Sequence, residues 1–139
     1  MDFLFGEGHL ETYAWPALVT ILLVIQYMVF TGLCGSARVK SGLKAPACHG
    51  DPAFERAFRV QQNTLEQLMT LIPSLWACAL FFRPDVAAIC GLVFFVGRIF
   101  YCVSYIGAPE KRAPGMIMGF LASVVLVLSA LWGVVSVLI

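Results

Sequence analysis

The sequence is poor in charge. Charged side chains make up 12% of the 139 residues, about half the share of an average soluble domain, whereas apolar side chains make up 60%. A soluble protein of this length could not bury so many apolar side chains, so we expect lipid to be its solvent. The net charge of only +1 argues against a nucleic-acid partner, because nucleic-acid-binding domains carry a clear basic excess.

Patterns that bind metals are also missing. The five cysteines are odd in number, and no pair of them has the spacing of a metal site. Four of them lie within apolar segments, where cysteine usually packs as a small hydrophobic side chain. The two histidines, His9 and His49, lie far apart in flanking segments. We therefore expect no metal cofactor.

Four apolar segments are long enough to cross a bilayer, which takes about 20 helical residues. We expect them at residues 13–37, 55–82, 86–105 and 114–138 of one domain that comprises residues 1–139. A chain in lipid must satisfy its backbone hydrogen bonds internally, so each segment is expected to be a helix. Arg83-Pro84-Asp85 predicts a tight connection, and Pro114 suits the first turn of the last helix. The predicted fold class is an all-α membrane protein.

Basic side chains are absent from both ends of the chain. The N-terminal tail carries Asp2, Glu7 and Glu11 but no lysine or arginine, and the C-terminal span carries none either. The basic residues gather in the first and third loops, while the short second loop carries only Arg83. By the positive-inside rule, both termini then lie outside and the polar clusters face the cytoplasm. The compact loops and short tails suit a bacterial inner membrane.

The start of the second span carries polar side chains. Glu55, Arg59, Asn63 and Glu66 stand at i, i+4, i+8 and i+11, which places them on one face of a helix. Charged groups at membrane depth need a partner or a function. Interfacial pairing and snorkelling would account for Glu55 and Arg59, but not for the deeper Asn63 and Glu66. The mixed charge is typical of a pocket for a zwitterionic ligand.

The third span ends in a second polar group. Arg98, Tyr101 and Tyr105 stand at i, i+3 and i+7 and share one face of a helix. Tyrosines near an interface can form a simple aromatic belt, an interpretation that suits Tyr105 better than Tyr101. Arg98 lies about two turns inside the span. We therefore expect it to pair with a carboxylate, either Glu66 or Glu55.

Together these motifs resemble the membrane-associated eicosanoid and glutathione metabolism family. The family signatures are Glu-Arg followed by Asn-x-x-Glu in the second span, and Arg-x-x-Tyr-x-x-x-Tyr in the third. They stand here as Glu55-Arg56, Asn63 to Glu66, and Arg98 to Tyr105. The motifs cover residues 36–112, and the span count covers the whole chain. The resemblance implies a homotrimer of left-handed four-helix bundles, with glutathione bound between neighbouring subunits near the cytoplasmic face.

The resemblance also implies roles for single residues. Arg112 would be catalytic and would hold the glutathione sulfur as a thiolate. The implied glutathione-binding residues are Arg38, Arg59, Gln61, Asn63, Glu66, Tyr101 and Tyr105. Glutathione would be the co-substrate, and a lipophilic electrophile would arrive laterally from the membrane lipid. The implied activity is that of a membrane-bound glutathione transferase, with either conjugation or hydroperoxide reduction as the reaction.

Three positions depart from the family pattern. Gln67 stands where many members have a tyrosine, Val39 stands where some have a second arginine, and Pro73 comes one turn later than usual. These departures favour a broad glutathione transferase over a dedicated leukotriene synthase. Two other classes stay open: a non-catalytic lipid-binding or scaffold protein of the same fold, and a small channel or transporter subunit.

Overall fold

The computed structural model describes residues 7–139, with side chains from Leu10 onward. Asp2 and the side chains of Glu7 and His9 lie outside the described part. The elements are α2 (Glu7–Ser41), α3 (Pro52–Phe81), α4 (Pro84–Gly107), the short 3-10 helix η1 (Pro109–Lys111) and α5 (Ala113–Leu138). Four helices in the described part are long and apolar enough to cross a membrane. The prediction of an all-α chain with four membrane-spanning helices is therefore confirmed.

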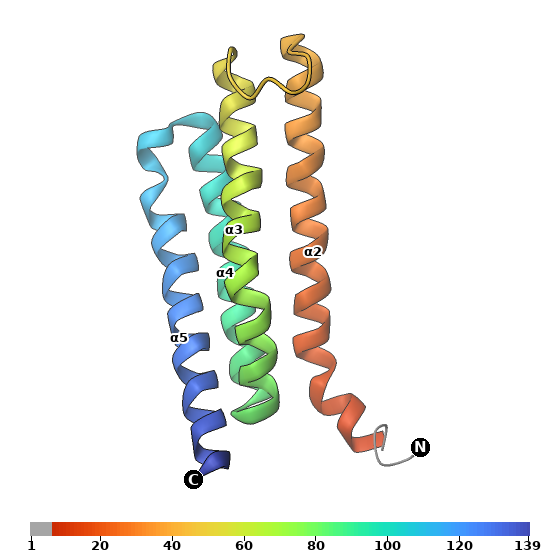
Figure 1. Cartoon of the computed structure of the whole chain (residues 1–139), viewed down its shortest axis with the longest axis vertical. Helices are drawn as coiled ribbons and strands as arrows, with labels where there is room; N and C mark the ends of the chain where they lie inside the picture. The colour runs from red at the N-terminus through yellow and green to blue at the C-terminus, as the bar shows by residue number, and fades with distance from the viewer. Residues whose placement is uncertain (1–6) are drawn as a thin grey trace.

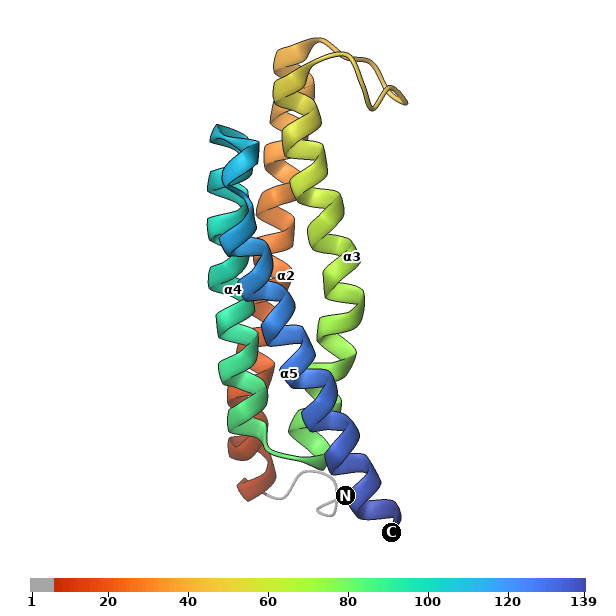
Figure 2. The same ribbon diagram turned by 90° about the vertical axis from the view of Figure 1, so that its left-hand side faces the viewer.

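The four long helices run side by side along the long axis of the molecule (Figures 1 and 2). Helices α3 and α4 each contact both α2 and α5, whereas α2 and α5 lie on opposite sides of the bundle. The α2–α3 loop and η1 lie at one end, and the α3–α4 connection lies at the other end with the C-terminus. The start of α3 and the end of α4, which carry the predicted polar groups, therefore meet at the same end.

Capping and proline explain where the helices begin and end. The Asp51 carboxylate accepts a hydrogen bond of 2.8 Å from Phe54 N, and Pro52 occupies the first turn, so α3 begins there. Arg56 Nη1 donates to Ile106 O at 3.1 Å and so satisfies a carbonyl at the end of α4. Helix α2 extends beyond the predicted 13–37 segment, because its last turn carries basic side chains that are favourable at a helix C-terminus.

Glycines bring α5 into direct contact with its neighbours at both ends. A Cβ atom at Gly115 would lie 2.5 Å from Tyr101 N and 2.8 Å from Gly97 O, so the α4 and α5 backbones touch there. Near the other end of α5, a Cβ atom at Gly133 would collide with the backbone of Phe81. Small residues at such contacts are typical of membrane helices, which associate through close packing. Both ends of α5 are therefore fixed by main-chain contacts.

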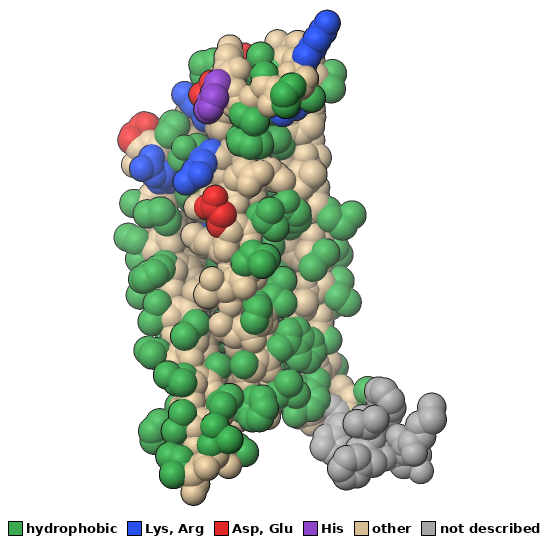
Figure 3. Space-filling view, viewed as in Figure 1, with side chains coloured by type: hydrophobic (Ala, Val, Ile, Leu, Met, Phe, Trp, Pro, Cys, Tyr) green, Lys and Arg blue, Asp and Glu red, His purple; other side chains and the backbone are tan. Residues whose placement is uncertain are grey.

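The outward faces of the bundle are apolar, and the charged side chains gather at one end. Trp15, Met28 and Trp132 each expose about two-thirds of their surface. Figure 3 shows the basic and acidic side chains near the α2–α3 loop and η1, above a face covered by hydrophobic side chains. This is the surface of an integral membrane protein, because so much exposed apolar area is tolerated in lipid and not in water.

Candidate functional site

A polar cleft lies at the charged end of the bundle. It has a volume of about 390 Å³ and is formed by the α2–α3 loop, the first turns of α3 and the end of α4. Its lining consists of Cys48, His49, Pro52, Glu55, Arg56, Phe58, Arg59 and Tyr105. Two guanidinium groups in one cleft are suited to carboxylates, which arginine can bind through two hydrogen bonds. No group of three or more potential ligands among the described side chains is arranged to hold a metal ion.

Arg59 and Glu66 form an ion pair on the outer face of α3. Arg59 Nη1 lies 3.9 Å from Glu66 Oε1, and the two side chains are 54% and 58% exposed. Glu66 lies about 21 Å along the helix from Pro52, at a rise of about 1.5 Å per residue. Its neighbour Met69 is 72% exposed. Exposed charges among apolar side chains are costly in lipid, so a ligand or a second subunit is expected to cover this face.

Four side chains form a continuous stack, called the aromatic column below. The guanidinium carbon of Arg98 lies 4.0 Å from the ring centroid of Tyr101. The rings of Tyr101 and Tyr105 are stacked, with their centroids 5.4 Å apart. The guanidinium carbon of Arg112 lies 5.8 Å from the ring centroid of Tyr105. The column connects the buried Arg98 to the exposed Arg112 and passes the polar cleft at Tyr105.

The prediction that Arg98 pairs with a carboxylate is wrong. Its Nε and Nη2 atoms donate to Thr64 Oγ1 at 3.1 and 2.7 Å, and its Nη1 atom donates to Asn63 Oδ1 at 3.0 Å. Two neutral acceptors and the ring of Tyr101 surround the buried cation. This arrangement avoids the desolvation of a second charge that a buried ion pair would require.

The two carboxylates expected near Arg98 have other partners. Glu66 pairs with Arg59 on the outer face of α3. Glu55 Oε1 accepts a hydrogen bond of 2.9 Å from Gly50 N and lies 4.0 Å from His49 Nδ1. Glu55 therefore supports the loop that closes the polar cleft.

Arg38 and Gln61 lie apart from the other predicted site residues within one chain. The guanidinium of Arg38 bonds to the α2–α3 loop and lies 4.4 Å from the ring centroid of Phe54. Gln61 Nε2 donates to the Tyr27 hydroxyl at 2.8 Å, so Gln61 faces α2. Gln61 follows Arg59 by two residues, about 200° around a helix, so the two side chains point in opposite directions.

The predicted site residues therefore form two groups in one subunit. One group lies along α3, along α4 and at the junction of η1 with α5, and consists of Arg59, Asn63, Glu66, Tyr101, Tyr105 and Arg112. Arg38 and Gln61 lie toward α2. Tyr101 itself is only 2% exposed, because Arg98 and Tyr105 cover its ring.

Thr64 is a residue of this site that the motifs did not single out. It is fully buried and accepts two of the three hydrogen bonds from Arg98. A signal is nonetheless present in the sequence, because Thr64 stands in the buried stripe of α3 between Val60 and Leu68. A buried polar side chain in an otherwise apolar stripe usually has a hydrogen-bond partner, and a neighbouring helix can supply it.

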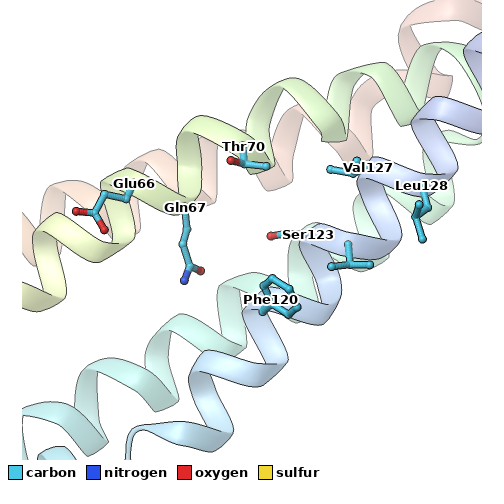
Figure 4. Close-up of a pocket in the computed structure, with 8 residues that line it drawn as sticks. Glu66, Gln67, Thr70, Phe120, Ser123, Val127 and Leu128 are labelled. Carbon is cyan, nitrogen blue, oxygen red and sulfur yellow. The ribbon is translucent and has the colours of Figure 1, made fainter.

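An apolar cleft of about 350 Å³ opens between α3 and α5 (Figure 4). Its lining consists of Glu66, Gln67, Thr70, Phe120, Ser123, Val124, Val127 and Leu128. In Figure 4 the Gln67 side chain extends from α3 toward α5 beside Phe120. Glu66 borders this cleft and also pairs with Arg59 of the polar cleft, so the two clefts are adjacent. An apolar pocket with a few polar groups is typical of a site for a lipophilic small molecule.

Comparison with known proteins identifies relatives along most of the chain. The sequence model of the MAPEG family, which is the membrane-associated eicosanoid and glutathione metabolism family, matches residues 16–132. An uncharacterized protein from Synechocystis is 47% identical over 117 residues, which cover 84% of this chain and 85% of that protein. Human microsomal glutathione S-transferase 2 is 39% identical over 108 residues, with coverages of 76% and 74%. Rat leukotriene C4 synthase is 34% identical over 102 residues, with coverages of 73% and 68%.

Proposed function

Because this chain belongs to the MAPEG family, we propose that it is a membrane-embedded glutathione transferase, which conjugates the glutathione thiolate to lipophilic electrophiles. Reduction of lipophilic hydroperoxides would be a second reaction of the same site. The observation that carries the proposal is a polar cleft lined by Arg59 and Tyr105 beside an apolar cleft lined by Glu66. Arg59 pairs with Glu66, and the ring of Tyr105 contacts the guanidinium of Arg112. One cleft suits a charged tripeptide, and the other suits a lipid-soluble acceptor.

The Arg59–Glu66 pair matches the charges of glutathione, which has two carboxylates, an amine and a thiol. The two side chains are 3.9 Å apart and about half exposed, so each can exchange its present partner for a ligand group. Arg59 would then bind a carboxylate, and Glu66 would bind the amine. Asn63 and Tyr105 would line the same site, and the buried Tyr101 would support the ring of Tyr105 from behind.

Arg112 is proposed to hold the sulfur. A thiol with an ordinary pKa of about 8.5 is mostly protonated at neutral pH, and a fixed cation nearby favours the thiolate. Arginine keeps its charge throughout the physiological range, and the ring of Tyr105 lies beneath the guanidinium of Arg112. Because this interaction is stronger with the thiolate than with the thiol, it favours the reactive form and does not merely increase binding.

The site is proposed to be shared between the subunits of a homotrimer. Arg38 and Gln61 lie on the α2 side of one chain, away from Arg59 and Glu66. A neighbouring subunit that packs its α2 side against the exposed Arg59–Glu66 pair would bring both groups to one ligand and cover the charges. We further propose that this site faces the cytoplasm of a bacterial cell and that both termini lie outside.

A titration of the detergent-purified protein with glutathione tests the proposal. We expect an ultraviolet absorbance of bound thiolate at neutral pH, no such absorbance with S-methylglutathione, and turnover with an aryl halide. Glutathione binding without turnover would favour a non-catalytic lipid-binding protein. Ion flux in vesicles without glutathione binding would favour a channel subunit. A monomer that binds glutathione tightly would contradict the shared site, and native mass spectrometry measures the oligomeric state.

A further inference from the structure

The buried guanidinium of Arg98 forms the base of the aromatic column. It is fully buried, and no carboxylate forms an ion pair with it among residues 10–139. Burying a charge is costly, and well-packed apolar residues are often at least as stabilising as buried charged groups. We propose that Arg98 is a positioning residue, which fixes the rings of Tyr101 and Tyr105 and thereby holds Arg112 at the glutathione sulfur. This inference rests on the proposed function, in which Arg112 stabilises the thiolate.

The hydrogen bonds fix the plane of the Arg98 guanidinium. Nε and Nη2 share Thr64 Oγ1, while Nη1 bonds to Asn63 Oδ1. The Thr64 hydroxyl donates its own hydrogen to Val60 O at 2.7 Å, so its lone pairs are left for Arg98. A side chain of α4 is thus tied at three atoms to two consecutive residues of α3. A guanidinium held in this way has little freedom to tilt.

The ring contacts extend this fixed plane toward Arg112. Tyr101 packs on the guanidinium of Arg98, and the ring of Tyr105 stacks on that of Tyr101 at an angle of 25°. Arg112 is exposed, and its hydrogen bond to Pro109 O is long, at 3.4 Å. An exposed arginine has many rotamers, so the ring of Tyr105 is a main restriction on where its charge lies. A tilt of Tyr101 would therefore displace the cation that faces the sulfur.

A purely structural role for Arg98 makes a different prediction. If its hydrogen bonds only tie α4 to α3, weakening them lowers thermal stability but leaves the chemistry of the folded trimer unchanged. If Arg98 positions Arg112, weakening them also lowers the fraction of bound glutathione that is thiolate. Thiolate absorbance and kcat, both per mole of folded protein, separate the two roles.

Thr64→Val is the main test, because it preserves the side-chain shape and removes the oxygen that accepts two of the Arg98 hydrogen bonds. We expect kcat to fall by about fivefold or more, with a matching loss of thiolate absorbance and a glutathione Kd within about twofold of wild type. Thr64→Ser keeps the hydroxyl and should restore both signals. Thr31→Val is the matched control, since Thr31 is an exposed threonine of α2 whose hydroxyl bonds to Tyr27 O.

Arg98→Lys provides a second test if Thr64→Val does not fold. Lysine keeps the charge, but it lacks the planar group that bonds to Thr64 and Asn63 while packing flat on Tyr101. We expect the same loss of kcat and thiolate absorbance. If either variant folds and has the wild-type kcat and the wild-type thiolate absorbance, the positioning role is overturned, even if the Tm of that variant is lower. A wild-type protein that neither binds nor conjugates glutathione would overturn the proposed function, and the positioning role with it.

Discussion

A methyl group added at Gly115 is expected to disturb both the packing of α5 and the position of Arg112. The Cβ atom of Gly115→Ala would lie 2.5 Å from Tyr101 N, 2.8 Å from Gly97 O and 2.9 Å from Tyr101 Cα. All three are backbone atoms of α4, so no rotamer change relieves the overlap. Ordinary contact begins at 3.4 Å, so the start of α5 must move by nearly 1 Å.

The displacement sets the expected magnitude. Overpacking of this kind costs about 1–3 kcal/mol of stability. Arg112 directly precedes α5, which begins at Ala113, so the proposed catalytic cation moves with the helix. A shift of about 1 Å at a reacting group can lower the rate about a hundredfold, and we expect a loss of turnover between about tenfold and a hundredfold.

The assay measures the Tm and the glutathione-dependent turnover of the purified protein. Gly32→Ala is the matched control, because a Cβ atom at Gly32 of α2 would meet nothing within 4 Å. Alanine is the better helix former by about 1 kcal/mol, so this control should have at least the wild-type Tm. If Gly115→Ala kept both the Tm and the turnover of wild type, the proposed link between the α4–α5 contact and Arg112 would be refuted.

Three further predictions concern the polar end of the bundle. Arg112→Ala should lower turnover by at least about tenfold, or about 1.4 kcal/mol in barrier, and abolish the thiolate absorbance; full activity would exclude it as the catalytic cation. Glu66→Gln should weaken glutathione binding with an unchanged Tm, since Glu66 pairs with exposed Arg59 and not with Arg98; calorimetry checks both quantities. Cysteines placed at Lys44 or Lys111 of a cysteine-free protein should resist membrane-impermeant thiol reagents in intact cells, and strong external labelling would reverse the topology.

The helices could be predicted from the sequence because lipid leaves a chain few choices. A long apolar segment in a bilayer must be helical. Pro84 and Pro109 stand where α4 and η1 begin in the structure. The end of α2 was less predictable. The predicted segment ended before Arg38 because charge is unfavourable in lipid, but a helix can continue into water, where basic side chains suit its C-terminus.

The partner of Arg98 could not be predicted, because it depends on how α3 is rotated relative to α4. The prediction that a carboxylate pairs with Arg98 rested on charge alone. The structure uses Thr64 and Asn63, which the rotation of α3 turns toward Arg98. The opposite directions of Arg59 and Gln61, by contrast, follow from their spacing and could have been predicted. Their separation is the reason why we propose a site shared between subunits.

The glycine contacts at both ends of α5 have a consequence for substrate selection. Gly115 and Gly133 hold the helix against α4 and α3 by main-chain contacts, and the apolar cleft lies along α5 between these two points. The cleft cannot widen by an outward swing of α5, so its cross-section is limited by side chains such as Phe120 and Leu128. These two side chains are about 60% exposed, which leaves the cleft accessible from the bilayer along its length. The cleft would therefore select an acceptor by its width and not by its length. A narrow acyl chain can enter the cleft and extend into the lipid, whereas a bulky ring system cannot enter the cleft.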